Sequence, residues 1–126
     1  MKFFIKQNAT FPKLRYGLSE KQLNDLNVTD EMLEKCAVTF SMRNYDTNRF
    51  KVANVGGNLF KSGRGHEYKY YLEFTFNTKH TNQEGIFTGE FVIDFFNNEC
   101  ANKLKLPISD VIYVIVSNSL TNTTVF

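Results

Sequence analysis

The sequence of 126 residues has few of the residues that small proteins use for covalent cross-links or metal sites. It contains no tryptophan, two cysteines, two histidines and two prolines. Cys36 and Cys100 could form one disulfide bond, but a chain of this length can fold without it. We expect two free, largely buried thiols. His66 and His80 have no second histidine three or four residues away, and there is no Cys-x-x-Cys pair. We therefore predict surface histidines and no metal site.

Excess charge and long apolar runs are also scarce. The net charge is +2 and the fifteen basic residues are dispersed, which disfavours a dedicated nucleic-acid binder. No apolar run approaches the ~20 residues that a membrane-spanning helix needs. The first apolar run, Phe3–Ile5, is followed at once by polar residues, so it lacks the apolar region of a signal peptide. We expect synthesis in a cytoplasm, with neither membrane nor nucleic acid as partner.

Catalytic motifs do not emerge from the sequence. The glycine-rich region lacks the glycine directly before Lys61-Ser62 that a phosphate-binding loop requires. Glu73, Glu90 and Asp94 occupy polar positions of strand-like runs, where solvated faces ordinarily carry charge. We therefore predict that the protein is not an enzyme and uses no cofactor.

The abundant residues are aromatic, with thirteen phenylalanines and six tyrosines. Within Tyr68–Phe96, apolar residues alternate with polar ones in two runs, the pattern of half-buried strands, and Gly89 is the small member of the second apolar set. The connection between the runs, Thr78–Gly85, is polar and ends in a glycine that can adopt positive φ. It is either an antiparallel hairpin or a corner where the chain crosses between two sheets.

The rest of the chain reads mostly as strands. The expected strand segments are Phe3–Gln7, Lys13–Leu18, Ala37–Arg43, Arg49–Ala53, an extended Leu104–Pro107, and Val111–Val116. Ser19 or Thr29 can begin a helix, and we expect one short helix near residues 29–35. The predicted fold is an all-β, immunoglobulin-like antiparallel β-sandwich of about seven to eight strands. We expect a single domain over residues 1–126, with peripheral N-terminal strands in 1–18 and a tail in 117–126.

Candidate interface residues come from aromatic and apolar side chains outside the core pattern. Tyr45, Tyr71 and Tyr113 fall off the core parity, and tyrosine gives contact area at low entropic cost. The run Val111–Val116 has no polar face, so it is either a central strand covered on both sides by its own chain or a strand whose outer face another subunit buries. Val111 and Ile115 therefore join the three tyrosines as candidate interface residues.

The segment 81–91 resembles a signature of tailed-bacteriophage structural domains similar to the N-terminal domain of upper baseplate proteins and related fibre-docking modules. The residues that carry the resemblance are Thr81, Gly85, Phe87, Glu90 and Phe91. Ala37–Met42 looks like the family's alternating strand that ends in methionine, and Lys51–Asn54 looks like the short strand that follows it. His80 stands where the family usually has aspartate.

The resemblance implies a noncatalytic, immunoglobulin-type β-sandwich that assembles virions. We accordingly expect a bacteriophage virion structural protein: a capsid decoration, fibre-docking or tail and baseplate adaptor protein. Its expected partners are other virion proteins, with the chain as a homo-oligomer or in multiple copies, located in the virion. The alternative is a carbohydrate-binding β-sandwich module for host surface glycans, which the absence of tryptophan disfavours.

Overall fold

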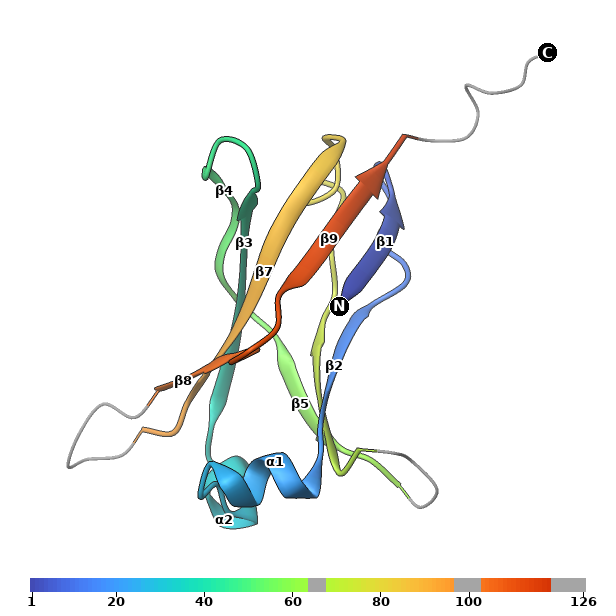
Figure 1. Cartoon of the computed structure of the whole chain (residues 1–126). Helices are drawn as coiled ribbons and strands as arrows, with labels where there is room; N and C mark the ends of the chain where they lie inside the picture. Colours follow the sequence, from blue (N-terminus) through green and yellow to red (C-terminus); the bar gives the residue numbers. More distant parts are fainter. Residues whose placement is uncertain (64–67, 97–102, 119–126) are drawn as a thin grey trace.

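The computed structural model describes residues 1–63, 68–96 and 103–118. Its elements form an all-β protein with two short helices (Figure 1). In chain order they are β1 Lys2–Lys6, β2 Leu14–Leu18, α1 Glu20–Asp25, α2 Asp30–Glu34, β3 Ala37–Asn44, β4 Phe50–Gly56, β5 Asn58–Lys61, β6 Tyr70–Phe74, β7 Gly85–Asp94, β8 Lys103–Leu106 and β9 Ile112–Ser117.

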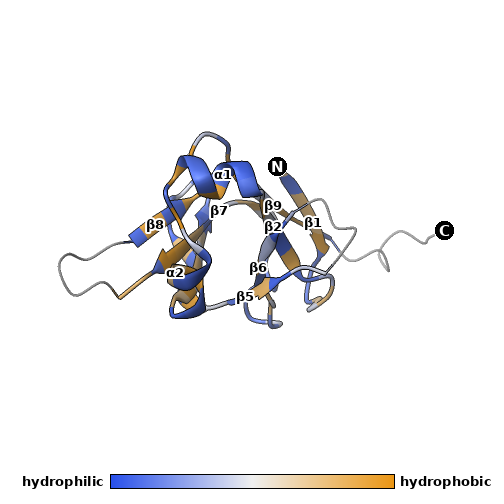
Figure 2. Ribbon diagram, turned by 90° about the horizontal axis from the view of Figure 1, so that it is seen from below, coloured by the Kyte–Doolittle hydropathy of each residue, from blue (hydrophilic) through white to orange (hydrophobic). Residues whose placement is uncertain are grey.

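The strands form two sheets, as the predicted sandwich requires. Sheet A has the order β1-β9-β7-β3-β4, with β8 also paired to β7, and sheet B has the order β2-β6-β5. Viewed from the end that carries the helices, the strands of both sheets surround one interior (Figure 2). One pairing departs from the predicted antiparallel arrangement, because β1 pairs with β9 in parallel. The described residues also contain nine strands, slightly more than predicted.

Phenylalanine rings join the two sheets in the core. The Phe40 ring of sheet A lies 4.5 Å from Phe74 of sheet B and 4.9 Å from Phe91 of sheet A, measured between ring centroids. All three side chains are fully buried. The predicted core parity of β6 and β7 is therefore confirmed.

The connection between β6 and β7 is a sandwich corner and not a hairpin. β6 pairs with β2 and β5 in sheet B, whereas β7 pairs with β3, β8 and β9 in sheet A. Residues 75–84 carry the chain from one sheet to the other. The expected strands at 37–43 and 49–53 are present as β3 and β4, which form an antiparallel hairpin whose register is irregular between Phe40 and Arg43.

Two helices stand where the sequence predicts one. Ser19 caps α1 by accepting from the Gln22 backbone N–H at 3.1 Å, and Thr29 caps α2 by accepting from the Met32 N–H at 3.2 Å. Both cap signals are used because Asn27, at a φ of 59°, turns the chain between the helices. Together they carry the chain from sheet B to sheet A across one end of the molecule (Figure 1).

The N-terminal strands lie at sheet edges but contribute to the core. β1 ends sheet A and β2 ends sheet B, and Ile5, Leu14 and Leu18 are buried. The predicted tail, residues 117–126, lies mostly outside the described residues. Its first residue, Ser117, is the last residue of β9, and the structure describes the chain only to residue 118.

The apolar run at 111–116 forms a central strand with only one fully covered face. β9 lies between β1 and β7, and Ile112, Val114 and Val116 are buried against the core. Tyr113 and Ile115 point the other way and are only half-buried. Within residues 1–63, 68–96 and 103–118, the outer face of β9 is therefore not fully covered, and the expectation of cover on both faces is wrong for that face.

Of the two cysteines, the structure describes only Cys36. Its side chain is half-buried, less than predicted, and its thiol donates to the Leu33 carbonyl at 3.2 Å. Burial raises the pKa of the Cys36 thiol, which disfavours a reactive thiolate. Cys100 and His66 lie outside the described residues.

Candidate interaction surface

A row of apolar side chains crosses the outer face of sheet A. In the strand register, Phe4 of β1 and Ile86 of β7 lie directly on either side of Ile115 of β9. Tyr45 continues the row, because its backbone N–H donates to the Ile86 carbonyl at 2.9 Å. We call these four residues the outer row. Phe4 is 62% exposed, Tyr45 58% and Ile86 47%, which is unusual for neighbouring apolar residues on one sheet face.

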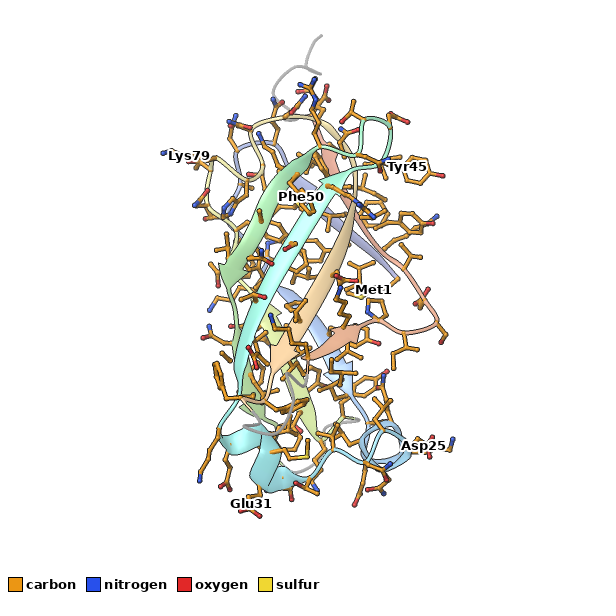
Figure 3. The ribbon with its side chains drawn as sticks, turned by 90° about the vertical axis from the view of Figure 1, so that its left-hand side faces the viewer. Met1, Asp25, Glu31, Tyr45, Phe50 and Lys79 are labelled. Atoms are coloured by element: carbon orange, nitrogen blue, oxygen red, sulfur yellow. The ribbon has the colours of Figure 1, made fainter. Side chains whose placement is uncertain are left out.

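Tyr113 widens the outer row on one side. Its ring lies 6.3 Å from the Tyr45 ring, with the two planes tilted by 55°. A shallow depression of about 340 Å³ lies here, lined by Lys2, Tyr45, Ile86, Tyr113 and Ile115. Tyr45 projects from the end of the molecule opposite the helices (Figure 3).

A groove lies next to the outer row on the same sheet. It measures about 570 Å³ and is lined by Ser41, Met42, Arg43, Phe50, Thr88, Gly89, Glu90, Lys105, Pro107 and Val111. The connection Pro107–Val111 lies between β8 and β9, which both pair with β7. Its residues Pro107 and Val111 form one wall of the groove. On the other wall the Arg43 guanidinium lies 6.0 Å from the centre of the Phe50 ring, a cation–π contact. The groove therefore offers charged and aromatic contacts beside the apolar row.

Four of the five candidate interface residues gather on this face. Tyr45, Tyr113 and Ile115 border the shallow depression, and Val111 lines the groove. Tyr71 does not join them, because it belongs to sheet B and stacks on Phe60 with ring centroids 5.6 Å apart.

Sequence reasoning missed Phe4, Ile86 and Phe50, which are also exposed on this face. Phe4 and Ile86 stand on the outward parity of their strands, so the alternation pattern alone indicates that each is exposed. Only the register across β1, β9 and β7 shows that they meet at Ile115.

Most of the motif residues within segment 81–91 have structural roles. Phe87 and Phe91 are core residues, and Gly85 adopts a φ of 150°, the positive value predicted for it. Thr81 is fully buried at the corner, although the sequence placed it in a polar connection. Glu90 is the exception, since it lines the groove on the outer face of sheet A.

His80 is part of the corner and not a simple surface histidine. Its Nδ1 accepts from the Asn77 backbone N–H at 3.1 Å, and its own backbone N–H donates to the Asn77 side-chain oxygen at 3.1 Å. Its ring centroid lies 5.5 Å from that of Phe74. Burial, with a smaller effect of the nearby Lys51 charge, lowers the pKa of His80, so its neutral form is favoured.

The three acidic residues considered for catalysis do not converge. Glu73 is on sheet B, where it is nearly buried and pairs with Arg15 at 2.9 Å and Lys13 at 3.6 Å. The prediction that it lies on a solvated face is therefore wrong. Glu90 and Asp94 belong to β7 in the other sheet. Within the described ranges, no group of three or more histidine, cysteine, aspartate or glutamate residues is placed to hold a metal ion.

Comparison with known protein families, curated proteins and solved structures finds no match to this chain. Among the helices of the described residues, none has the length and apolarity needed to cross a membrane. The chain is an all-β, sandwich-like protein that carries a row of apolar side chains on one outer sheet face.

Proposed function

We propose that the protein is a noncatalytic structural module that acts by docking to other proteins, and that the assembly it joins is a tailed-bacteriophage virion. The outer row on sheet A is the observation that carries the docking proposal. Contiguous exposed apolar residues on a folded domain commonly mark an interaction site, because covering them removes apolar surface from water. Aromatic and arginine side chains are enriched in such interfaces. Tyr45, Tyr113 and Arg43 supply them here.

The virion part of the proposal rests on the resemblance of segment 81–91 to phage structural domains. Four of its motif positions have structural roles that explain the residue type: buried Thr81 at the corner, Gly85 at positive φ, and Phe87 and Phe91 in the core. At His80, the ring nitrogen accepts the Asn77 N–H, which an aspartate carboxylate can also do. The departure from the family pattern therefore retains an acceptor at the corner.

Within a virion, a module of this size fits a capsid decoration, fibre-docking or tail and baseplate adaptor protein. Other virion proteins are its proposed partners, and the chain is present in multiple copies. The carbohydrate-binding alternative needs coplanar exposed rings. Tyr45 and Tyr113, the neighbouring tyrosines of the outer face, are tilted by 55°, so this face favours protein docking.

The test is the location of the chain during infection. An antibody against the purified protein is used on fractions of an infected lysate separated on a density gradient, and the particles are analysed by mass spectrometry. We expect the chain to sediment with intact particles in a constant ratio to the other virion proteins. Recovery only in the soluble fraction, without virion proteins in a pull-down, would overturn the proposal.

A further inference from the structure

Strand β1 leaves one side of its backbone unpaired in the described structure. Its partner β9 lies on one side, and among the described strands none pairs with the other side (Figure 1). The Met1 carbonyl accepts from the Tyr113 N–H at 2.8 Å, and the Gln7 N–H donates to the Ser117 carbonyl at 2.8 Å. In a parallel ladder alternate residues bond to the neighbouring strand. Lys2, Phe4 and Lys6 therefore turn their backbone groups away from β9.

These outward backbone groups form a template for an additional strand. The Lys6 carbonyl is already used, since it accepts from the Ala9 N–H at 3.1 Å. The amide groups of Lys2 and Phe4 and the N–H of Lys6 are placed to pair with an incoming extended chain.

The side chains of the same three residues define what can pair there. Residues two apart in a strand share a face, so Lys2, Phe4 and Lys6 all lie on the outer face of sheet A, and all three are exposed. The edge thus presents positive, apolar and positive side chains in succession. Opposite charges on directly facing positions of neighbouring strands stabilise the pairing, and like charges destabilise it.

This pattern opposes pairing of β1 with a second copy of itself. In an antiparallel pair centred on Phe4, Lys2 of each copy would face Lys6 of the other. In a parallel pair in register, each lysine would face its own counterpart. Lysine on an edge strand is a known means of preventing such self-association.

We propose that the β1 edge is a docking site for an extended segment of a partner protein that carries acidic residues two positions before and two positions after an apolar residue. The acidic side chains pair with Lys2 and Lys6, and the apolar one extends the outer row beside Phe4. This inference deepens the proposed function, on which it rests only for the identity of the partner as a virion protein.

Binding is tested with a synthetic probe and the full chain. The probe is an acetylated seven-residue peptide of threonine, with glutamate at its second and sixth positions and valine at its fourth; the control carries lysine in place of both glutamates. We expect the acidic peptide at millimolar concentration to shift the NMR amide resonances of Lys2, Phe4 and Lys6, with affinity about fivefold higher than the control. Equal shifts from both peptides, or no shift from either, overturn the proposal.

Two variants of Phe4 separate strand addition from simple apolar contact. Phe4→Pro and Phe4→Ala both remove the ring, but only proline also removes the outward N–H, and this N–H is not needed for pairing with β9. We expect the acidic peptide to retain measurable binding to Phe4→Ala and to lose it with Phe4→Pro. Circular dichroism and the dispersion of the other amide resonances check that both variants fold. Equal binding to the two folded variants overturns strand addition.

The variant Lys6→Glu tests the charge rule without any partner. It makes the edge self-complementary, because Lys2 of one copy then faces the introduced carboxylate of the other in an antiparallel pair. We expect Lys6→Glu to self-associate more strongly than the wild type by analytical ultracentrifugation, with added salt reducing the difference. The matched control is Lys79→Glu, which makes the same change of charge at an exposed turn position outside every described strand and should not do so. These tests use no virion. They can therefore fail while the protein is still found in particles, and they can succeed while it is not.

Discussion

At the scale of single residues, the corner between β6 and β7 depends on polar side chains tied to the N-terminal connection. The Thr81 hydroxyl donates to the Ala9 carbonyl at 2.7 Å, and the Asn8 N–H donates to the Thr81 carbonyl at 2.9 Å. The Gln7 side-chain amide donates to the Asn82 carbonyl at 2.9 Å. These bonds join the end of β1 to the corner.

We predict that Thr81→Val destabilises the protein by about 1–3 kcal/mol. Valine matches the shape of threonine but cannot donate to the Ala9 carbonyl, which loses this donor beside a fully buried side chain. Urea unfolding of the variant and the wild type measures the difference. The matched control is Thr78→Val, an exposed threonine in the same connection, which we expect to change stability by less than about 0.5 kcal/mol. Equal effects at the two positions would contradict a role for the Thr81 hydroxyl.

His80 gives the corner a dependence on pH. Its pKa in the folded protein is lowered from the ordinary value of 6.5, so folding favours the neutral ring. The resulting stabilisation is fully present above about pH 6.5 and is lost as the pH falls through the folded pKa. Protonation also removes the Nδ1 lone pair that accepts the Asn77 N–H.

We predict that His80→Asn reduces the loss of stability on acidification. The asparagine oxygen can accept the same N–H but does not titrate. Urea unfolding at about pH 7 and about pH 5 should show a larger drop for the wild type than for His80→Asn, since other titrating groups are common to both. An identical drop in both proteins would show that His80 does not contribute to the acid sensitivity.

At the scale of strands and helices, the sequence predicts what depends on local pattern. Alternation identifies the buried faces of β6 and β7, and the polar signals at Ser19 and Thr29 mark true helix starts, because burial parity and capping involve near neighbours. Strand partners depend on distant residues. The crossing of the chain between sheets at 75–84 and the parallel pairing of β1 with β9 therefore did not follow from the sequence.

The same distinction explains the errors at individual positions. Glu73 stands on the polar parity of its strand, but it is nearly buried because Arg15, directly opposite on β2, and Lys13 pair with it. Phe4 and Ile86 are unremarkable alone, since single exposed apolar residues are common. Their gathering into the outer row follows only from the register of three strands.

Strand β7 needs glycine at position 89 because of the aromatic core. A Cβ atom added there would lie 2.8 Å from Cζ of the fully buried Phe40 ring. We predict that Gly89→Ala destabilises the protein by about 1–3 kcal/mol through overpacking. Gly56→Ala is the control, because a Cβ at that position of β4 meets nothing within 4 Å. Thermal unfolding of both variants measures the effect, and a Gly89→Ala protein as stable as Gly56→Ala would contradict the tight contact.

At the scale of the whole molecule, the two sheets differ in what they present to solvent. The outer face of sheet A carries the apolar outer row and the groove. On sheet B the exposed Arg15 side chain is paired with the nearly buried Glu73 and lies beside Phe60, whose ring stacks on Tyr71. Side chains already paired within one chain have less to gain from a partner, so we infer that docking uses sheet A.

The variant Ile86→Glu tests whether docking uses the outer face of sheet A. Ile86 is half-exposed in the middle of the outer row, so the variant should fold with a stability within about 0.5 kcal/mol of the wild type. A carboxylate there would have to lose its hydration in the interface, and we expect incorporation into particles to fall by about tenfold or more, as for a central interface residue. Phe11→Glu is the control, because Phe11 is 78% exposed on the connection between β1 and β2, outside the outer row. If quantitative mass spectrometry of purified particles showed the larger loss for Phe11→Glu, the docking surface would lie at the β1–β2 connection and not on sheet A.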